Sequence, residues 1–386
     1  MKIKVKFSEA LYLTCYVLFI ILIYIFGEIY NKPRIMWLVF PVLSVGMLLA
    51  VIMKGKETAR NLWYRLIIVM IYWVAAIISK KPQVLVYAAL ICGADITSFE
   101  KICRCCIFTC VTVVVITMLL NALGFLPNGH WYRFGVQINT FGFGYYAIVP
   151  YTFFYIVLSY LFLKYEKGKI ATWGEIGIIL AINYLIYTQT TVRLTYYLNY
   201  LTILLYVLLI KIGLFKLTNK VLNFLTILIF PSLFIFSIWA NYSFTYSNPM
   251  FFRVNMILSN RLALGNEALR RYSINLFGNY IVTNNSVIAE EYFYIDSGFL
   301  FSLLGYGLLF TGLMLAVYIY MHHYSAKTNN KMLFIWLTMV AVFSFSNNTW
   351  IAIQYNPITL LFPTVIKQMR PQMHINSNAK SLIKKS

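Results

Sequence analysis

Long apolar stretches separated by short polar segments run through the whole chain. A helix of about 20 apolar residues crosses the hydrocarbon core of a bilayer, and fewer suffice when a helix end is buried in protein. The pattern therefore predicts an all-α polytopic membrane protein with about twelve transmembrane helices. They are expected near residues 9–29, 35–53, 62–79, 82–95, 103–124, 141–163, 172–190, 194–212, 221–241, 297–321, 332–348 and 351–366.

One connecting segment is much longer than the others. Residues 242–296, between the ninth and the tenth predicted helix, are too many for a simple connection. Apolar residues are interleaved with charge from Phe251 to Leu258, which predicts a helix that lies on or dips into the membrane. We find no internal repeat and no soluble domain. Residues 1–386 therefore form one membrane domain that contains this loop and ends in a basic tail, 367–386.

Composition supports the membrane assignment. Hydrophobic residues make up 61% of the chain and charged residues only 11%, whereas soluble domains carry about 25% charged residues. A chain this apolar cannot cover its surface with polar groups in water, so lipid must be the solvent for much of it. The net charge of +21 then indicates basic loops at an anionic inner leaflet. No basic stretch lies in a soluble module, which argues against nucleic-acid binding.

The distribution of positive charge predicts the orientation. Most of the 32 Lys and Arg residues fall on one side of the predicted helices if the N-terminus is cytoplasmic, and cytoplasmic loops carry such an excess. Both termini are then cytoplasmic, and 242–296 is extracytoplasmic. Thr97 with Glu100, and Thr172 with Glu175, have the spacing of capping boxes at two cytoplasmic helix starts.

The basic residues predicted to lie outside are mostly arginines. An arginine presents a planar fork of donors that matches phosphate and carboxylate groups, so a group of them predicts an anion-binding site. Arg133, Arg261, Arg270 and Arg271, each taken alone, are better explained as solvated charges or as charges that contact lipid headgroups. Arg193 lies between two apolar stretches, where an arginine is costly and usually paired or functional. A functional role is favoured for it over the alternative that its side chain extends to lipid headgroups. The outer arginines of the predicted site are Arg133, Arg193, Arg261, Arg270 and Arg271.

Three acidic residues lie near the end of the long loop. Asp296 directly precedes the predicted helix 297–321, and Glu290 and Glu291 come shortly before it. A carboxylate at such a place is a general base that activates a hydroxyl group, the ion-pair partner of an arginine, or a charge at the membrane interface. The chain has no glycine-rich phosphate loop and no outer set of metal ligands. We therefore expect chemistry without ATP, cofactor or metal.

Five short segments resemble, in order and spacing, those of a known family. The family is the Wzy-type polysaccharide polymerases, which belong with the O-antigen ligases to a metal-independent group of glycosyltransferases. The likeness covers roughly 83–366 and has departures: Gln137 and Ile138 stand where the family has His-Pro, Val192 where it has Ser, and Asn260 where it has Gly. The similar segments are Arg133–Gly142, Thr190–Tyr196, Ser259–Leu262, Tyr294–Leu300 and Asn356-Pro357.

The resemblance implies a multi-pass protein of the bacterial cytoplasmic membrane. It would join oligosaccharide repeat units, linked to polyprenyl pyrophosphate, into a surface polysaccharide at the outer face. Its partners would be the lipid-linked donor and acceptor and the bilayer, with a flippase and a chain-length regulator nearby. The implied catalytic residues are Arg193, Arg261 and Asp296, and the implied substrate-binding residues are Arg133, Asn139, Arg270, Arg271, Glu290 and Glu291.

Other functions fit the same number of helices. A transporter or flippase of lipid-linked oligosaccharides would line a central cavity with charge, but intramembrane charge is scarce in this sequence. An O-antigen-type ligase would share the short motifs, which do not separate the two transferases. A purely structural assembly partner would have no need of the long charged loop.

Overall fold

The computed structural model describes residues 2–54, 59–129, 131–133, 136–214, 216–217, 219–284 and 293–369. In this part of the chain, seven helices are long and apolar enough to cross a membrane, and three shorter apolar helices add to them. The predicted class, a helical multi-pass membrane protein, is therefore confirmed. The number of twelve crossings stays a prediction.

The helices follow the predicted apolar stretches closely in the first two thirds of the chain. They are α1 (Lys2–Ile23, continued by the π-helix Tyr24–Ile29), α2 (Pro33–Met53), α3 (Ala59–Ser79), α4 (Gln83–Gly93, continued by the 3-10 helix Ala94–Ile96), α5 (Phe99–Ala122), α6 (Ile148–Glu166), α7 (Trp173–Thr190), α8 (Arg193–Tyr206, continued by the π-helix Val207–Lys211), α9 (Lys220–Tyr242), α10 (Pro249–Ile257), α11 (Arg261–Arg271), α12 (Gly298–Phe301, continued by the π-helix Ser302–Tyr306), α13 (Gly307–Lys327), α14 (Lys331–Ser344) and α15 (Phe362–Met369). A small antiparallel hairpin, β1 (Trp131–Arg133) and β2 (Val136–Ile138), lies between α5 and α6.

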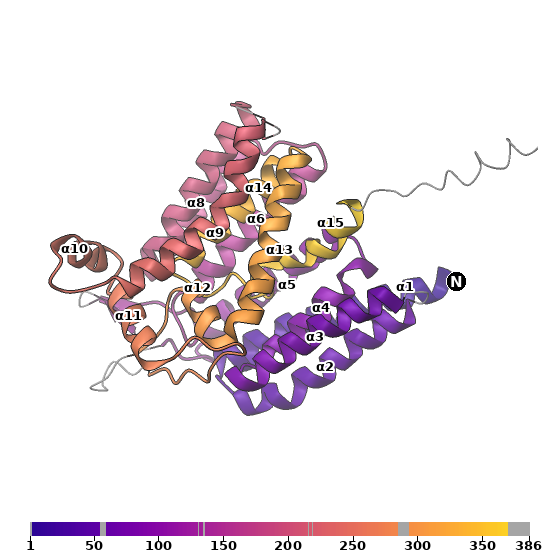
Figure 1. Cartoon of the computed structure of the whole chain (residues 1–386), viewed down its shortest axis with the longest axis horizontal. Coiled ribbons are helices and arrows are strands. Elements are labelled where there is room, and N and C mark those ends of the chain that lie inside the picture. The colour runs from indigo at the N-terminus through magenta and orange to yellow at the C-terminus, as the bar shows by residue number, and fades with distance from the viewer. Residues whose placement is uncertain are drawn as a thin grey trace, which may run out of the picture.

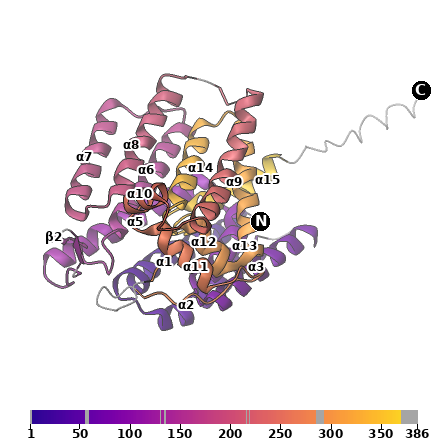
Figure 2. The same cartoon turned by 60° about the vertical axis from the view of Figure 1, so that its left-hand side comes forward.

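The long helices form two groups. Helices α1 to α4 lie side by side in one group, and α6, α7, α8, α9 and α14 form the other (Figures 1 and 2). Helix α5 joins the groups because it packs against both α1 and α6, and α13 does so because it packs against α3, α9 and α14. The short helices α10 and α11 lie together at the left-hand end of the molecule in Figure 1, where the ends of both groups approach each other.

Contacts between the segments that connect the helices show which of these segments lie on the same face of the molecule. On the face predicted to be cytoplasmic, the carboxylate of Asp95, after α4, pairs with Lys54 at the end of α2 (Nζ to Oδ2, 2.8 Å) and with Lys367 of α15. On the other face, the amide of Gly144 donates to the carbonyl of Glu28 at 2.7 Å. This sorting agrees with the predicted alternation of the helices. Which face is cytoplasmic stays a prediction from charge.

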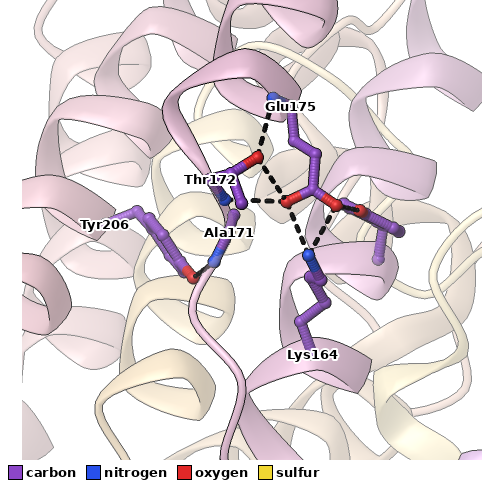
Figure 3. A network of polar contacts seen from close by, with 6 residues as sticks. Lys164, Ala171, Thr172, Glu175 and Tyr206 are labelled. Carbon is purple, nitrogen blue, oxygen red and sulfur yellow. Dashed lines mark hydrogen bonds and ion pairs between the residues drawn. The ribbon is translucent and has the colours of Figure 1, made fainter.

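The predicted capping box at the start of α7 is present (Figure 3). The Thr172 hydroxyl accepts a hydrogen bond from the Glu175 amide at 3.2 Å, and the Glu175 carboxylate accepts one from the Thr172 amide at 2.7 Å. Lys164, at the end of α6, pairs with the same carboxylate. The cap therefore also fixes the turn that joins α6 to α7.

The predicted cap at the start of α5 is wrong by one residue. Ser98, not Thr97, is the N-cap, and its hydroxyl accepts a hydrogen bond from the Lys101 amide at 3.4 Å. The Thr97 hydroxyl instead donates to the carboxylate of Glu9 at 2.6 Å. The carboxylate of Glu9 in α1 is a charged and therefore stronger acceptor for the Thr97 hydroxyl. Local sequence spacing does not reveal a partner on another helix.

The last predicted span, 351–366, is not one continuous helix. The chain is irregular from the end of α14 to Asn356, forms the 3-10 helix Pro357–Leu361 and only then enters α15. Trp350 and Asn356 are fully buried, and the Asn356 side chain donates to the Trp350 carbonyl at 2.9 Å and accepts from the Trp336 indole at 3.0 Å. Such backbone is tolerated at membrane depth only where protein buries it and supplies its partners, as happens here.

The segment between α9 and α12 contains helices α10 and α11. The helix predicted around Phe251–Leu258 is present as α10. Met250 and Ile257 expose 75% and 79% of their surfaces, as a helix in contact with lipid would. The membrane contact itself stays a prediction.

Candidate functional site

Arg261 and Asp296 form an ion pair between two helix starts. Arg261 is the first residue of α11, and Asp296 lies just before α12. The Arg261 Nε atom lies 3.4 Å from Asp296 Oδ2, and the two side chains expose only 23% and 17% of their surfaces. The structure therefore brings together two of the three residues predicted to be catalytic.

A tight turn between α10 and α11 directs Arg261 towards the protein. Ser259 and Asn260 both adopt positive φ angles, 56° and 65°, so the chain reverses within two residues. Asn255 of α10 is buried and holds this turn. Its side-chain amide donates to Asn260 Oδ1 at 3.1 Å, and its Oδ1 accepts from the Ala263 amide at 3.1 Å. Asn255 thus fixes the direction of the first turn of α11.

Helix α11 is held close to the end of α9 by the absence of a side chain at Gly265. A Cβ atom at this position would lie 1.7 Å from Oδ1 of Asn241. One residue further on, the Asn266 side-chain amide donates to the carbonyls of Asn241 and Tyr242, at 2.9 and 3.1 Å. The helix that carries Arg261 therefore rests directly on a long membrane helix.

Asp296 is fixed by the start of α12. Ser297 is its N-cap: the hydroxyl accepts from the Leu300 amide at 3.3 Å and lies 3.0 Å from the Ser237 hydroxyl of α9. Gly298 has no room for a side chain, since its Cβ would lie 2.3 Å from the Asn347 carbonyl. Two packed elements therefore hold the backbone beside the carboxylate.

The part of the long loop that directly follows α11 is joined to the helix break after α12. The Asn279 amide donates to the Gly305 carbonyl at 3.2 Å, and the Leu308 amide donates to the Asn275 carbonyl at 3.0 Å. Gly307 makes the break with a φ angle of 89°. These bonds satisfy backbone groups that the break frees, and they tie the loop to the helices that carry Asp296.

The pair has an unusual electrostatic setting. Burial raises the pKa of Asp296 above its usual value, and the charge of Arg261 offsets this only in part. Burial acts to lower the pKa of Arg261, but the charge of Asp296 and the hydroxyls of Tyr151 and Tyr145 outweigh it, so the arginine pKa is raised. Arg261 therefore stays charged, while Asp296 takes up a proton more readily than a solvated aspartate.

Three tyrosines lie within electrostatic range of the pair. Tyr145 and Tyr146 lie just before α6, and Tyr151 lies in its first turns. Their hydroxyls are near enough to Arg261 to act electrostatically on its guanidinium. The rings of Tyr145 and Tyr146 also contact Trp131 of β1, with centroids 5.4 Å apart in each case. Tyr145 and Tyr146 thus interact electrostatically with the pair and, through their rings, contact Trp131.

An open cleft of about 750 Å³ lies along α11. Arg270 and Arg271, both exposed, line it together with Glu267 and Asn266. Arg271 pairs with Glu267 one helical turn earlier and lies over the ring of Phe293, 4.5 Å from its centroid. Two predicted substrate-binding arginines therefore share a cleft on the same short helix as Arg261.

Arg193 lies at the corner between α7 and α8, and it does not line the cleft along α11. It is exposed and begins α8, after the N-cap Val192, which itself follows Thr191 in a left-handed conformation. The amide of Asn139 donates to the carbonyl of Gln189 at 3.1 Å, which joins the hairpin segment to the end of α7. The side chain of Asn139 accepts from the Phe141 amide at 2.8 Å and so shapes its own turn. Contacts thus run from the α7–α8 corner through the hairpin towards Trp131.

The remaining predicted residues are only partly described. Arg133 is the last residue of β1, but its side chain lies outside the description. Glu290 and Glu291 lie outside the described residues, as does the tail beyond Met369. Their predicted roles stay predictions.

Sequence patterns did not single out two groups of residues at this face. The first group is Trp131, Tyr145 and Tyr146. No sequence pattern distinguishes them from the other members of the 61 Tyr and Phe residues and 8 tryptophans of the chain. Glu28, whose carboxylate accepts from the Tyr355 hydroxyl at 2.8 Å, was detectable as an acid inside an apolar stretch, because such acids are costly and usually paired or functional.

Comparison with known proteins gave no match: no family model, no curated protein and no solved structure matches this chain.

Proposed function

We propose that this protein is a membrane glycosyltransferase that joins oligosaccharide units linked to polyprenyl pyrophosphate into a longer polysaccharide. The observation that carries the proposal is the Arg261–Asp296 pair: a constrained, largely buried arginine and a carboxylate of raised pKa on one face of a helical membrane protein. The ordered segments that resemble Wzy-type polymerases contain both residues and support the same conclusion.

Arg261 and Asp296 suit the leaving group and the attacking hydroxyl group of a glycosyl transfer, respectively. The acceptor hydroxyl oxygen bonds to the anomeric carbon of the donor, and the bond from that carbon to the pyrophosphate oxygen breaks. The pyrophosphate leaves with the electron pair, and Arg261 stabilises its developing charge. The hydroxyl proton passes to the Asp296 carboxylate, whose raised pKa makes it a better base than a solvated aspartate. The lipid pyrophosphate is already activated, so no nucleotide enters the reaction.

The cleft along α11, the helix that begins with Arg261, suits the remaining negative charge of a substrate. Arg270 and Arg271 carry positive charge on its wall, and the donor fork of an arginine matches phosphate oxygens. Arg193, at the α7–α8 corner, adds positive charge on the same face. These three arginines are proposed to bind substrate, whereas Arg261 contacts the group that leaves.

Variants in the producing cell test the proposal. Arg261→Ala and Arg193→Ala are expected to abolish long-chain polymer on gels of surface polysaccharide while the protein still reaches the membrane. Arg261→Lys keeps the charge but loses the fork, so we expect most of the polymer to be lost here too. Arg253→Ala is the matched control, because Arg253 is an exposed arginine of the same segment on α10.

Three outcomes separate the functions. Normal polymer in both alanine variants contradicts the proposed role of the arginines. Loss of all surface glycan with lipid-linked units trapped on the inner leaflet indicates a flippase. Single units that accumulate at the outer leaflet, without extension, agree with a polymerase.

A further inference from the structure

Trp131, Tyr145 and Tyr146 pack together, and the two tyrosines lie within electrostatic range of Arg261. Trp131 contacts Tyr145 with an interplanar angle of 75° and Tyr146 with one of 64°, and the two tyrosine rings lie 4.6 Å apart. All three residues are half-buried. The Trp131 indole donates to the Gly144 carbonyl at 3.0 Å, which fixes the ring plane. We call these three residues the aromatic cluster.

The cluster has a rigid base. Gly144, the acceptor of the indole, donates its own amide to the Glu28 carbonyl at the end of α1. Thr140 and Asn128 close the hairpin segment, since the Asn128 side chain accepts from the Thr140 amide at 2.8 Å. The rings are therefore held by the hairpin on one side and by a membrane helix on the other.

Aromatic rings of this kind match the surface of a sugar. The face of a pyranose ring presents apolar C–H groups, and its edge presents hydroxyls. A half-buried Trp or Tyr offers an apolar face with a polar group at its edge. Rings held in fixed orientations also lose little conformational entropy when a ligand binds. Because the three residues are half-buried, part of their surface is open to a ligand.

We propose that the aromatic cluster is the subsite that binds the sugar ring at the reaction centre, placing it against Arg261 and Asp296. This inference rests on the proposed function and adds the position of the sugar. The ligand class is a neutral or weakly charged pyranose unit of the lipid-linked glycan. Its affinity comes from the rings, while affinity for the pyrophosphate comes from the arginines.

Two probes separate these contributions on the purified full-length protein. The first is a set of short oligosaccharides obtained by partial hydrolysis of the producing cell's own surface polysaccharide, which carry no pyrophosphate. The second is farnesyl pyrophosphate, which carries no sugar. Binding of each is measured by saturation-transfer NMR and titration. Trp131→Ala is expected to weaken oligosaccharide binding by about tenfold or more and to leave farnesyl pyrophosphate binding unchanged, whereas Arg261→Ala should do the reverse.

Further variants guard against simple misfolding. Tyr132→Ala is the matched control, because Tyr132 is the next residue of the strand and points to the opposite side, with 66% of its surface exposed. It should bind both probes normally. Trp131→Phe keeps an aromatic face and should recover part of the oligosaccharide affinity. Retained farnesyl pyrophosphate binding shows that the Trp131 and Tyr132 variants are folded, and retained oligosaccharide binding shows the same for Arg261→Ala.

The outcomes are distinct. The inference is overturned if Trp131→Ala binds the oligosaccharides as strongly as the wild type, or if the wild type does not bind them. The proposed function still stands in that case if farnesyl pyrophosphate binds through Arg261. If the wild type binds neither probe, the proposed function fails as well.

Discussion

Removing Arg261 should destabilise the protein through the carboxylate that it leaves behind. In Arg261→Ala, Asp296 keeps its buried position but loses the charge that lowers its pKa. At the observed 3.4 Å, an effective dielectric constant of about 20 gives a gross attraction of about 5 kcal/mol. Desolvation offsets part of this value, and both side chains keep some exposure. We therefore expect a net loss of about 2–3 kcal/mol, below the range for fully buried pairs.

A double-mutant cycle measures this quantity. Asp296→Asn removes the charge but keeps the shape, so Arg261→Ala combined with Asp296→Asn should regain at least half of the stability lost in Arg261→Ala. Unfolding would be followed by tryptophan fluorescence during titration of mixed micelles with sodium dodecyl sulfate. Arg253→Ala, which removes an exposed arginine, should change stability by no more than about 0.5 kcal/mol.

Two results would refute this reasoning. If Arg261→Ala is as stable as the wild type, the arginine charge does not compensate the cost of burying the Asp296 carboxylate. A double variant that loses the sum of the two single losses means that the residues do not interact energetically. The double variant should remain inactive in either case, which separates the catalytic role of the pair from its structural role.

Three further predictions concern pH, packing and orientation. Burial raises the folded-state pKa of Asp296, so the stability gained from its protonation is full below the unfolded-state pKa and is lost as pH rises through the folded-state pKa. The base must be unprotonated to act, so the rate of glycan extension should rise with pH along an acid limb centred above about 4. An acid limb centred at the usual pKa of an aspartate would contradict this prediction. Gly265→Ala should cost about 1–3 kcal/mol and reduce polymer, because its Cβ would lie 1.7 Å from Asn241 Oδ1, whereas Gly177→Ala, with open space at its Cβ, should be neutral or stabilising in the same unfolding assay. Ser247→Cys should react with a membrane-impermeant maleimide in intact cells and Thr328→Cys only after permeabilisation; the opposite pattern would reverse the predicted orientation.

The helical framework could be predicted because lipid imposes a simple rule on the sequence. Apolar stretches such as 35–53 and 103–124 have the length of a membrane helix, and they correspond to α2 and α5. The rule failed at 351–366. There the partners of the backbone are the side chains and carbonyls around Asn356, which only the folded interior provides.

The candidate site was only partly accessible from the sequence. Arg261 and Asp296 could each be selected by residue type and position, but their pairing depends on the reversal at Asn260 and on the contact of Gly265 with α9. The aromatic cluster could not be selected, because nothing local distinguishes Tyr145 from the many other tyrosines. Long-range packing brings these groups together, and a single sequence does not encode it in a readable pattern.

Reconstitution tests the central proposal most directly. Purified protein in liposomes would be given the lipid-pyrophosphate-linked oligosaccharide of the producing cell, without nucleotide, and the products would be separated by size. We predict a ladder of extended glycans with release of lipid pyrophosphate, absent in Arg261→Ala and present in Arg253→Ala. Movement of the lipid between leaflets without any extension, or extension that persists without Arg261, would contradict the account.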